Sequence, residues 1–538
     1  MTAYIGSELA RHVKRLRGPQ GPHGRAHYTE RRTAVNGFGG VPRPPARNRA
    51  SGGRCPGRRP AVYHSLPHAL SGLTARPGAG PMAAVDGPLI TGSLPSRRQP
   101  RSPGESVRDI VVAFAVAGFM QLCGFATGVL AARLLLPAGR GELAAVLLWC
   151  GLIASISAIS LDQALVYRMA RQRGHERRLT VLALLISQPL ALLAILAGWV
   201  LLPRLLSGVS GSTLDAAWVV LLFTPLGHIA MILQGAQQGR LRLIEWNLIR
   251  ALQPAGYLLG IGVTVLLFGA NVTGFVAAFL FGQVLVLIAL LWRAPKSIGG
   301  GDAKPVASDL KPLLGYAVGV HSAGLVGTAN QFLGRAVIAL HLPAAELGLF
   351  AVAGAMNGAV GIIAQTLSRL AFPKIANADD DVQRSLIFAR YFKLNVVISG
   401  GATALGVVLA PWFVPLVFGQ AFAEAVPATQ ILLVAGLMAG TRQMATAGLR
   451  AHGDNVSTLG SESLNLALQV ACLAVLLPLL GIVGAAVAVV AGEGAGLLYM
   501  MRTAWRRLGL SVSALSVPTA DDFAVLARLL RDLLARRR

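Results

Sequence analysis

Charged residues are scarce in this chain. They make up 13% of its 538 residues, whereas a soluble domain carries roughly 25%. Aromatic residues are also few, at 6%, while hydrophobic residues reach 54%. A chain this poor in charge cannot cover a soluble core with a polar surface, so the composition argues against an ordinary soluble protein.

Cysteine is nearly absent. The four cysteines are Cys55, Cys123, Cys150 and Cys472, and no two of them form a CxxC pair or a metal-binding spacing with histidine. Three lie in apolar runs, where cysteine acts as a small hydrophobic residue. We therefore expect no disulfide framework, no metal and no other cofactor.

Motifs for chemistry are missing as well. The chain has no P-loop, so we expect no ATP-driven step on this chain. No order of Ser, His and Asp suggests a nucleophilic triad, and we expect no catalytic residue. We interpret the protein as a non-enzyme.

Long apolar runs are abundant. Runs of about 20 residues recur from Ile110 to Met501, and each is long enough to cross a hydrocarbon core of about 30 Å. They predict an all-α, polytopic membrane protein with about twelve transmembrane helices. The expected spans are 110–134, 143–163, 179–202, 214–236, 249–269, 272–292, 313–340, 347–370, 391–412, 425–445, 458–479 and 482–501.

The positive charge is unevenly distributed. Half of the net charge of +26 lies in residues 1–109, which we expect to form a disordered basic cytosolic tail. A basic tail beside a membrane meets anionic lipid headgroups more readily than nucleic acid, so no nucleic-acid partner is expected. A second basic tail, 503–538, has an amphipathic pattern from Asp521 to Leu534 that suits the membrane surface.

The loops set the orientation. Loops on one side of the spans carry 19 Lys and Arg residues, while those on the other carry Arg140 and Arg204. The positive-inside rule then places both termini in the cytosol of a bacterial cell, with the spans in its plasma membrane.

The chain carries an internal echo. Leu134-Leu-Leu-Pro-Ala-Gly-Arg-Gly-Glu-Leu143 is repeated about 206 residues later as Leu340-His-Leu-Pro-Ala-Ala-Glu-Leu-Gly-Leu-Phe350. An echo at this spacing indicates a duplication, and six spans per copy make the copies parallel, as in transporters that rock around a central cavity. The expected organisation is the tail 1–109, a six-helix bundle 110–292, a cytosolic linker 293–312, a pseudo-twofold related bundle 313–502 and the tail 503–538.

Three segments carry a family resemblance. Arg133–Leu143, Ala371-Phe-Pro-Lys-Ile-Ala376 and Pro478-Leu-Leu-Gly-Ile-Val-Gly-Ala-Ala486 resemble signatures of bacterial polysaccharide flippases. These form the O-antigen or exopolysaccharide branch of the multidrug/oligosaccharidyl-lipid/polysaccharide exporter superfamily. The resemblance implies two bundles facing across a cavity. It also implies flipping of an undecaprenyl-pyrophosphate-linked oligosaccharide for cell-surface polysaccharide, such as lipopolysaccharide, with polymerase or ligase machinery as possible partners.

Polar residues inside spans are the site candidates, because charge in a span usually faces a cavity or a partner. The pyrophosphate candidate is Arg335, which shares a helix face with His321 and Thr328; snorkelling to the surface is the alternative. Polar contacts between helices are the alternative for His321 and Gln331. In the family a carboxylate often follows this arginine by two residues, but Val337 stands there.

Further candidates lie in other spans. Asn357 and Gln365 share a face of span 8 and could instead join helices. Arg369 and Arg390 could receive the pyrophosphate at the cytosolic mouth; for Arg369, near an inner span end, pairing or snorkelling at the membrane interface is the alternative. Glu493, the deepest carboxylate, is either a proton-coupling group or a neutral hydrogen-bonded acid.

Two other functions remain open at this stage. A drug/cation antiporter of the same superfamily would require acidic residues in its substrate-binding lobe. The spans of this chain hold few acidic residues, which argues against that function. A non-transporting membrane scaffold for a polysaccharide assembly complex would leave Arg335 dispensable.

Overall fold

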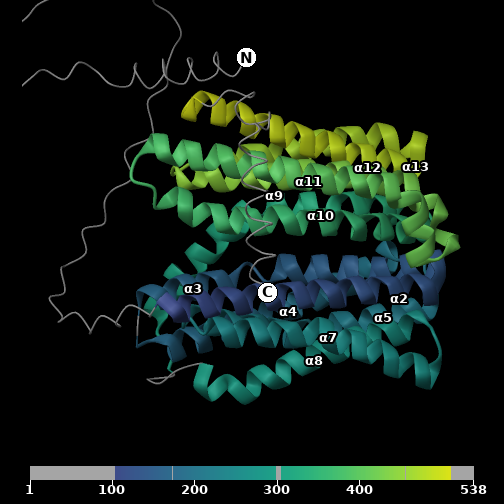
Figure 1. Ribbon diagram of the computed structural model, residues 1–538. Coiled ribbons are helices and arrows are strands. Elements are labelled where there is room, and N and C mark those ends of the chain that lie inside the picture. Colours follow the sequence, from purple (N-terminus) through teal and green to yellow (C-terminus); the bar gives the residue numbers. More distant parts are fainter. Residues whose placement is uncertain (1–102, 173, 298–303, 455, 510–538) are drawn as a thin grey trace, which may run out of the picture. The chain divides into compact units, whose positions relative to one another are not determined.

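The computed structural model describes residues 103–172, 174–297, 304–454 and 456–509, and these are helical throughout apart from short turns (Figure 1). They belong to one compact unit, Ser96–Arg538. The predictions for the two tails lie outside the described residues, except that the first helix begins at Pro103 and the last ends at Leu508.

The helices follow in two sets. The first half comprises α2 (Pro103–Ser157), α3 (Leu161–Arg171), α4 (Glu176–Leu205), α5 (Gly211–Leu222), α6 (Thr224–Gly239), α7 (Leu243–Phe268) and α8 (Val272–Ser297). The second half comprises α9 (Ala307–His341), α10 (Ala344–Ala376), α11 (Asp381–Phe418), the 3₁₀ turn η1 (Gln420–Ala425), α12 (Val426–Ala451) and α13 (Val456–Leu508). The domain boundaries given above stay predictions.

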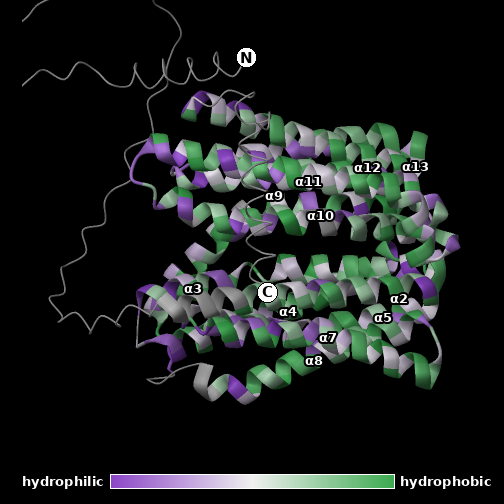
Figure 2. Cartoon of the chain, in the orientation of Figure 1, coloured by the Kyte–Doolittle hydropathy of each residue, from purple (hydrophilic) through white to green (hydrophobic). Residues whose placement is uncertain are grey.

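Hydrophobic residues cover long stretches of these helices (Figure 2). In the described part of the chain, 8 helices are long and apolar enough to cross a membrane, or up to 9 if the bent pair α5–α6 counts as one span. The polytopic all-α prediction is confirmed, while the count of twelve spans stays a prediction.

Two of the long helices are hairpins of two limbs. α2 breaks at Leu136, whose φ is 58°, just before Pro137. A residue before proline is pushed out of the helical region, and proline removes the next helical donor. α13 breaks at Gly481, whose φ is 55°, a conformation that glycine adopts without steric cost. Each break reverses the chain and separates two of the predicted spans.

The helices therefore have two ends, which we name by their chemistry. The hairpin end holds Leu136, the α9–α10 turn at 342–343 and Gly481. The basic end holds the turns after α3, α6, α10 and α12. Both Leu-Pro-Ala segments lie at the hairpin end.

At the hairpin end the two halves touch through backbone. A Cβ added to Gly141 in α2 would lie 1.6 Å from the carbonyl oxygen of Ala344, and one added to Gly348 in α10 would lie 2.1 Å from that of Pro137. Gly348 follows Gly141 by 207 residues, and Ala344 follows Pro137 by the same number. The contact therefore has the symmetry of the duplication, and only glycine fits at its two centres.

A side chain adds to this contact. Arg133 in α2 donates from Nε to the carbonyl oxygen of Val417 at 2.7 Å and from its terminal nitrogen to that of Leu416. These carbonyls lie at the end of α11, where a helix leaves its last acceptors unpaired and carries negative partial charge. Arg133 thus joins the two halves.

One helix of the second half also packs deep in the first. Near the start of α9, Asp309 pairs with Arg178 at 2.8 Å and lies 3.8 Å from Arg168. Tyr316 of α9 stacks on Tyr167 of α3, with ring centroids 3.9 Å apart. The beginning of α9 is therefore held by first-half helices at the basic end.

The other end of α9 belongs to the second half. Asn330 donates to the Glu462 carboxylate in α13 at 2.7 Å. Gly334 lies against Gln469 and Val489 of α13. The long predicted span is one continuous helix of 35 residues, and it links the first half at one end to the second half at the other.

The turn between α12 and α13 contains a buried acid. Asp454 accepts hydrogen bonds from the backbone and the hydroxyl of Ser457, at 3.1 and 2.6 Å, and pairs with Arg507 at 2.8 Å. Burial alone would raise the pKa of this carboxyl, but the Ser457 bonds and the Arg507 charge together lower it below its ordinary value. The carboxylate fastens both ends of α13 to one turn.

The effect of Asp454 on stability should depend on pH. Because its pKa is lower in the folded chain, its stabilisation is complete above the ordinary value of 3.8 and is lost as pH falls through the lower folded value. Asp454→Ala should lower the free energy of unfolding at neutral pH by about 1–2 kcal/mol. Thermal unfolding in detergent, followed against pH, measures both effects. Asp454→Asn, which keeps the cap and loses the charge, should fall between the wild type and Asp454→Ala; stability equal to that of the wild type at neutral pH would contradict the role of charge.

Candidate functional site

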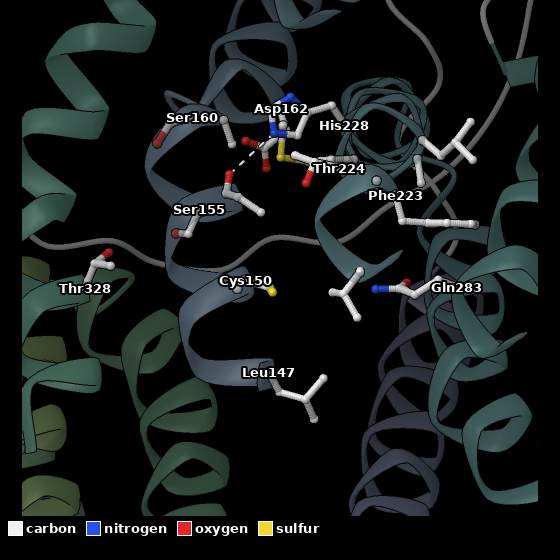
Figure 3. A pocket seen from close by; sticks show the side chains of 18 of the residues that line it. Leu147, Cys150, Ser155, Ser160, Asp162, Phe223, Thr224, His228, Gln283 and Thr328 are labelled. Carbon is white, nitrogen blue, oxygen red and sulfur yellow. Dashed lines mark hydrogen bonds between the residues drawn. The ribbon is translucent and has the colours of Figure 1, made fainter. Parts of the chain in front are cut away.

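The first half encloses a cavity of about 560 Å³ (Figure 3). Its walls come from the second limb of α2, the start of α3, the α5–α6 bend, α8 and the middle of α9. α9 supplies His321 and Thr328, two of the predicted site residues. The cavity thus lies within one bundle and is walled on one side by the helix that also reaches the second half.

Two broken helices border this cavity. Between α2 and α3, Ile159 and Ser160 have φ of 40° and 54°, values that residues other than glycine adopt only under strain. Between α5 and α6 the chain bends by 42° at Phe223, where Pro225 removes a helical donor. In membrane proteins, broken helices are tolerated where they line a cavity, and they mark binding sites in transporters.

Some polar groups of the wall are already bonded within the protein. His228 of α6 lies with Nδ1 3.1 Å from the carbonyl oxygen of Ser187 and Nε2 3.2 Å from the Ser157 hydroxyl. Because a carbonyl only accepts, Nδ1 carries the proton in that bond. His321 of α9 lies 3.4 Å from the Ser160 hydroxyl. These two histidines hold α6 and α9 against the broken end of α2.

Other polar groups of the wall are free. Ser155, Gln163, Gln283 and Thr328 line the cavity, and none of them makes a hydrogen bond to another side chain or to backbone in the described part of the chain. Figure 3 shows Gln283 and Thr328 on opposite sides of the cavity, with Ser155 between them. Their donors and acceptors are available to a ligand.

Arg335 does not line the cavity but lies within electrostatic range of a second arginine. The charge of Arg335 acts on that of Arg140, as does the hydroxyl of Tyr257 in α7. Arg335 donates to the carbonyl oxygen of Gln331 at 3.2 Å and lies 5.4 Å from the centre of the Phe332 ring. Two arginines, one from each half, therefore lie within electrostatic range of each other near the hairpin end.

Neither arginine has a carboxylate partner among the described residues. The neighbouring acid, Glu142, instead accepts hydrogen bonds from Ser210 at 3.0 Å and from Thr213. The buried Nε of Arg140 has no hydrogen-bond partner. Two half-buried guanidinium groups without an acid form a site suited to an anion, because buried charge calls for a partner.

Glu493 lies in a separate ionic cluster in the second half. Arg442 of α12 donates to Glu493 at 2.9 and 3.3 Å and pairs with Glu462 at 2.5 Å. Asn465 and Asn330 donate to the two carboxylates at 3.0 and 2.7 Å. The carboxylate predicted as a coupling group is thus salt-bridged rather than isolated, and two acids share one arginine.

The remaining predicted residues lie apart from the cavity. Gln331 and Gln365 are exposed, and Asn357 packs against Gly436 of α12. Arg369 of α10 is exposed and lies within electrostatic range of Arg250 of α7, another arginine pair between the halves. Arg390 is exposed on α11.

Sequence reasoning missed several members of these sites. Arg140 was counted as an outer loop charge, and its partner stands 195 residues away along the chain. Gln163, His228 and Gln283 were passed over because single polar residues in a span most often join helices. The Thr224-Pro225 step inside a predicted span was the available signal for a broken, cavity-lining helix.

No group of three or more His, Cys, Asp or Glu side chains in the part described by the structure is placed to hold a metal ion.

The fold is that of known transporters. The chain is similar to the inward closed structure of the lipid II flippase MurJ, with a TM-score of 0.64 and 14% identity over 79% of this chain and 96% of that one. It is also similar to an inward-facing multidrug resistance MATE family transporter of the MOP superfamily, with a TM-score of 0.60 and 16% identity over 74% of this chain and 98% of that one. The predicted fold of two bundles is confirmed.

The sequence comparison points to one family. Among curated proteins no similar sequence was found. The family model described as polysaccharide biosynthesis protein matches residues 129–427, which is more than half of the chain and runs from the first limb of α2 into α12. The resemblance seen in the sequence motifs is confirmed, and this chain belongs to the polysaccharide biosynthesis protein family.

Proposed function

We propose that the protein flips an undecaprenyl-pyrophosphate-linked oligosaccharide from the cytosolic to the outer leaflet of the bacterial plasma membrane. In this proposal it is a transporter and not an enzyme, and both termini are cytosolic. The observation that carries the proposal is that Arg140 and Arg335 lie within electrostatic range of each other, and that the buried Nε of Arg140 has no hydrogen-bond partner. A family that builds polysaccharides supplies a matching anion, the pyrophosphate that joins glycan to lipid.

The geometry suits alternating access. The Gly141–Gly348 contact closes the hairpin end, which the distribution of Lys and Arg places outward. At the basic end, Arg250 and Arg369, one from each half, lie within electrostatic range of each other, where they would attract an anionic headgroup. Binding of the pyrophosphate by both members of the outer pair would neutralise their repulsion and draw the halves together around it.

The ionic cluster is the proposed coupling element. Glu462 and Glu493 share one arginine, so one carboxylate is in excess and is the proposed proton acceptor. Protonation of Glu462 would weaken its bond from Asn330 of α9. Because α9 also carries Arg335, this provides a physical link between proton binding and substrate release.

The proposal is tested by removing the arginine pair. Arg335→Ala and Arg140→Ala should each reduce flipping of the lipid-linked glycan by about tenfold to a hundredfold, because each loses a charge-assisted bond worth roughly 1.5–3 kcal/mol. The measurement is the accumulation of lipid-linked glycan in the inner leaflet of cells that lack the wild-type protein. Arg335→Lys, which keeps the charge and loses the bidentate fork, should be intermediate.

The matched control is Arg204→Ala. Arg204 is exposed near the hairpin end of α4 and bonds only to its own helix, at Val200. The Arg204→Ala variant should flip the lipid-linked glycan as the wild type does when the two proteins are present at equal levels. Normal flipping by Arg335→Ala and Arg140→Ala would overturn the proposal and favour a scaffold role.

A further inference from the structure

We propose that the cavity in the first half is a binding pocket for an uncharged sugar, namely the sugars nearest the pyrophosphate of the transported glycan. This inference rests on the proposed function. It assigns the cavity the sugar, while the arginine pair takes the pyrophosphate.

The charge of the lining excludes the pyrophosphate from the cavity itself. The lining residues include no Lys or Arg and one carboxylate, Asp162. That carboxylate stands at the start of α3, beside the backbone N–H of Gln163. A wall with these properties suits a ligand that carries no charge.

The free polar groups suit sugar hydroxyls. Ser155, Gln163, Gln283 and Thr328 offer hydroxyl and amide groups from α2, α3, α8 and α9, and each can both donate and accept. A sugar hydroxyl also does both. Ser155 and Gln163 are exposed to the cavity and Gln283 and Thr328 are half-buried, so a ligand that bonds several of them at once gains specificity.

The rest of the wall is apolar. Phe223, Phe279 and Leu280 belong to it, and they suit the C–H faces of a sugar ring. Its volume of about 560 Å³ lies within the range of roughly 300–1,000 Å³ of small-molecule sites. A mostly apolar pocket with a few convergent polar groups is the usual design of such sites.

The position relative to the arginine pair supports the same ligand. Thr328 in the cavity and Arg335 outside it stand seven residues apart on α9, about 10 Å along a helix. The first one or two sugars linked to a pyrophosphate bridge such a distance. A single substrate molecule can therefore contact both sites and hold α9 through both.

The test uses saturation-transfer NMR on the full-length protein in detergent micelles. The probes are glucose and N-acetylglucosamine, with glucuronate as an anionic comparison and tetraphenylphosphonium as a lipophilic cation. The wild type should bind the neutral sugars more strongly than the two charged probes. Gly151→Leu should reduce the sugar signal at least about tenfold, since a Cβ at Gly151 has free space and a larger side chain fills the cavity.

Two further variants sharpen this result. Gln163→Leu with Gln283→Leu keeps the cavity and removes two amides, so sugar binding should weaken by about tenfold, as expected for two lost hydrogen bonds. Gly262→Leu is the matched control, because Gly262 is exposed on α7 and also has free space at Cβ; it should bind sugar as the wild type does. Equal sugar signals in all variants would overturn the inference. So would preferential binding of tetraphenylphosphonium that is lost in Gly151→Leu.

Glycan flipping in cells separates this inference from the proposed function. If Arg335→Ala blocks flipping while Gly151→Leu and the double glutamine variant flip normally, the flippase stands and the sugar pocket fails. If the wild type binds neutral sugars in the cavity but does not flip lipid-linked glycan, the pocket stands and the proposed function fails. Loss of flipping in Arg335→Ala and in the cavity variants, at normal protein levels, supports both the proposed function and the sugar pocket.

Discussion

Gly141→Val should abolish transport by preventing the two halves from closing at the hairpin end. The added Cβ would overlap the carbonyl oxygen of Ala344, and backbone cannot swing aside as a flexible side chain can. The start of α10 must therefore move away from α2. Gly348→Val should have the same effect, because its Cβ would overlap the carbonyl oxygen of Pro137.

Accessibility of the interior measures this opening directly. With Thr328→Cys added, a membrane-impermeant thiol reagent applied outside should label Gly141→Val much faster than the parent; glycan flipping, measured without Thr328→Cys, should be lost in Gly141→Val. Gly118→Val is the matched control on the same helix, where a Cβ meets nothing within 4 Å; it should flip normally and stay protected. Normal flipping and protection in Gly141→Val would contradict a closed state built on this contact.

Arg442→Met should destabilise the protein by about 3–5 kcal/mol, the usual cost of breaking a buried ion pair from one side. Its removal leaves Glu462 and Glu493 as two half-buried acids without their shared cation. Their side chains are only 23% and 14% exposed, so solvent screens them little. A large fall in the thermal unfolding midpoint in detergent, together with loss of flipping, is the expected result.

A triple variant separates stability from coupling. Adding Glu462→Gln and Glu493→Gln to Arg442→Met removes the charges together, and replacing a buried ion cluster by neutral groups is often neutral for stability. The unfolding midpoint should recover while flipping does not, because no group is left to take up the proton. Recovery of flipping along with stability would show that the cluster serves the fold alone.

The membrane-spanning architecture could be predicted because the bilayer imposes it. Each helix must bury its backbone polar groups and fill the hydrocarbon, so long apolar runs and a Leu-Pro turn suffice to place helices and hairpins. The breaks at Leu136 and Gly481 lie between predicted spans for this reason. The bend between α5 and α6 was not predicted, since both of its sides are apolar. The helix α3 was not predicted because its polar sequence, with Arg168 and Arg171, is typical of a loop.

The sites were harder to predict because their members meet only in the folded chain. Arg335 was singled out by its depth in a span, but its partner Arg140 depends on the packing of α9 beside α2. The same holds for Arg442 with Glu493, whose pairing depends on how α12 packs on α13. His321 and Thr328 were expected on the same helix face as Arg335. Because the first part of α9 packs against first-half helices, these two side chains line the cavity instead.

The glycine crossing has a consequence for how such a protein can change. Gly141 and Gly348 meet backbone atoms of Ala344 and Pro137. How closely the two halves approach in the closed state is therefore set by main-chain atoms, which do not change when side chains are substituted. Side chains of the cavity wall can then be exchanged without altering where the halves stop. Selectivity for a new glycan could be engineered at Gln163 or Gln283 while the extent of the movement between the two halves stays the same.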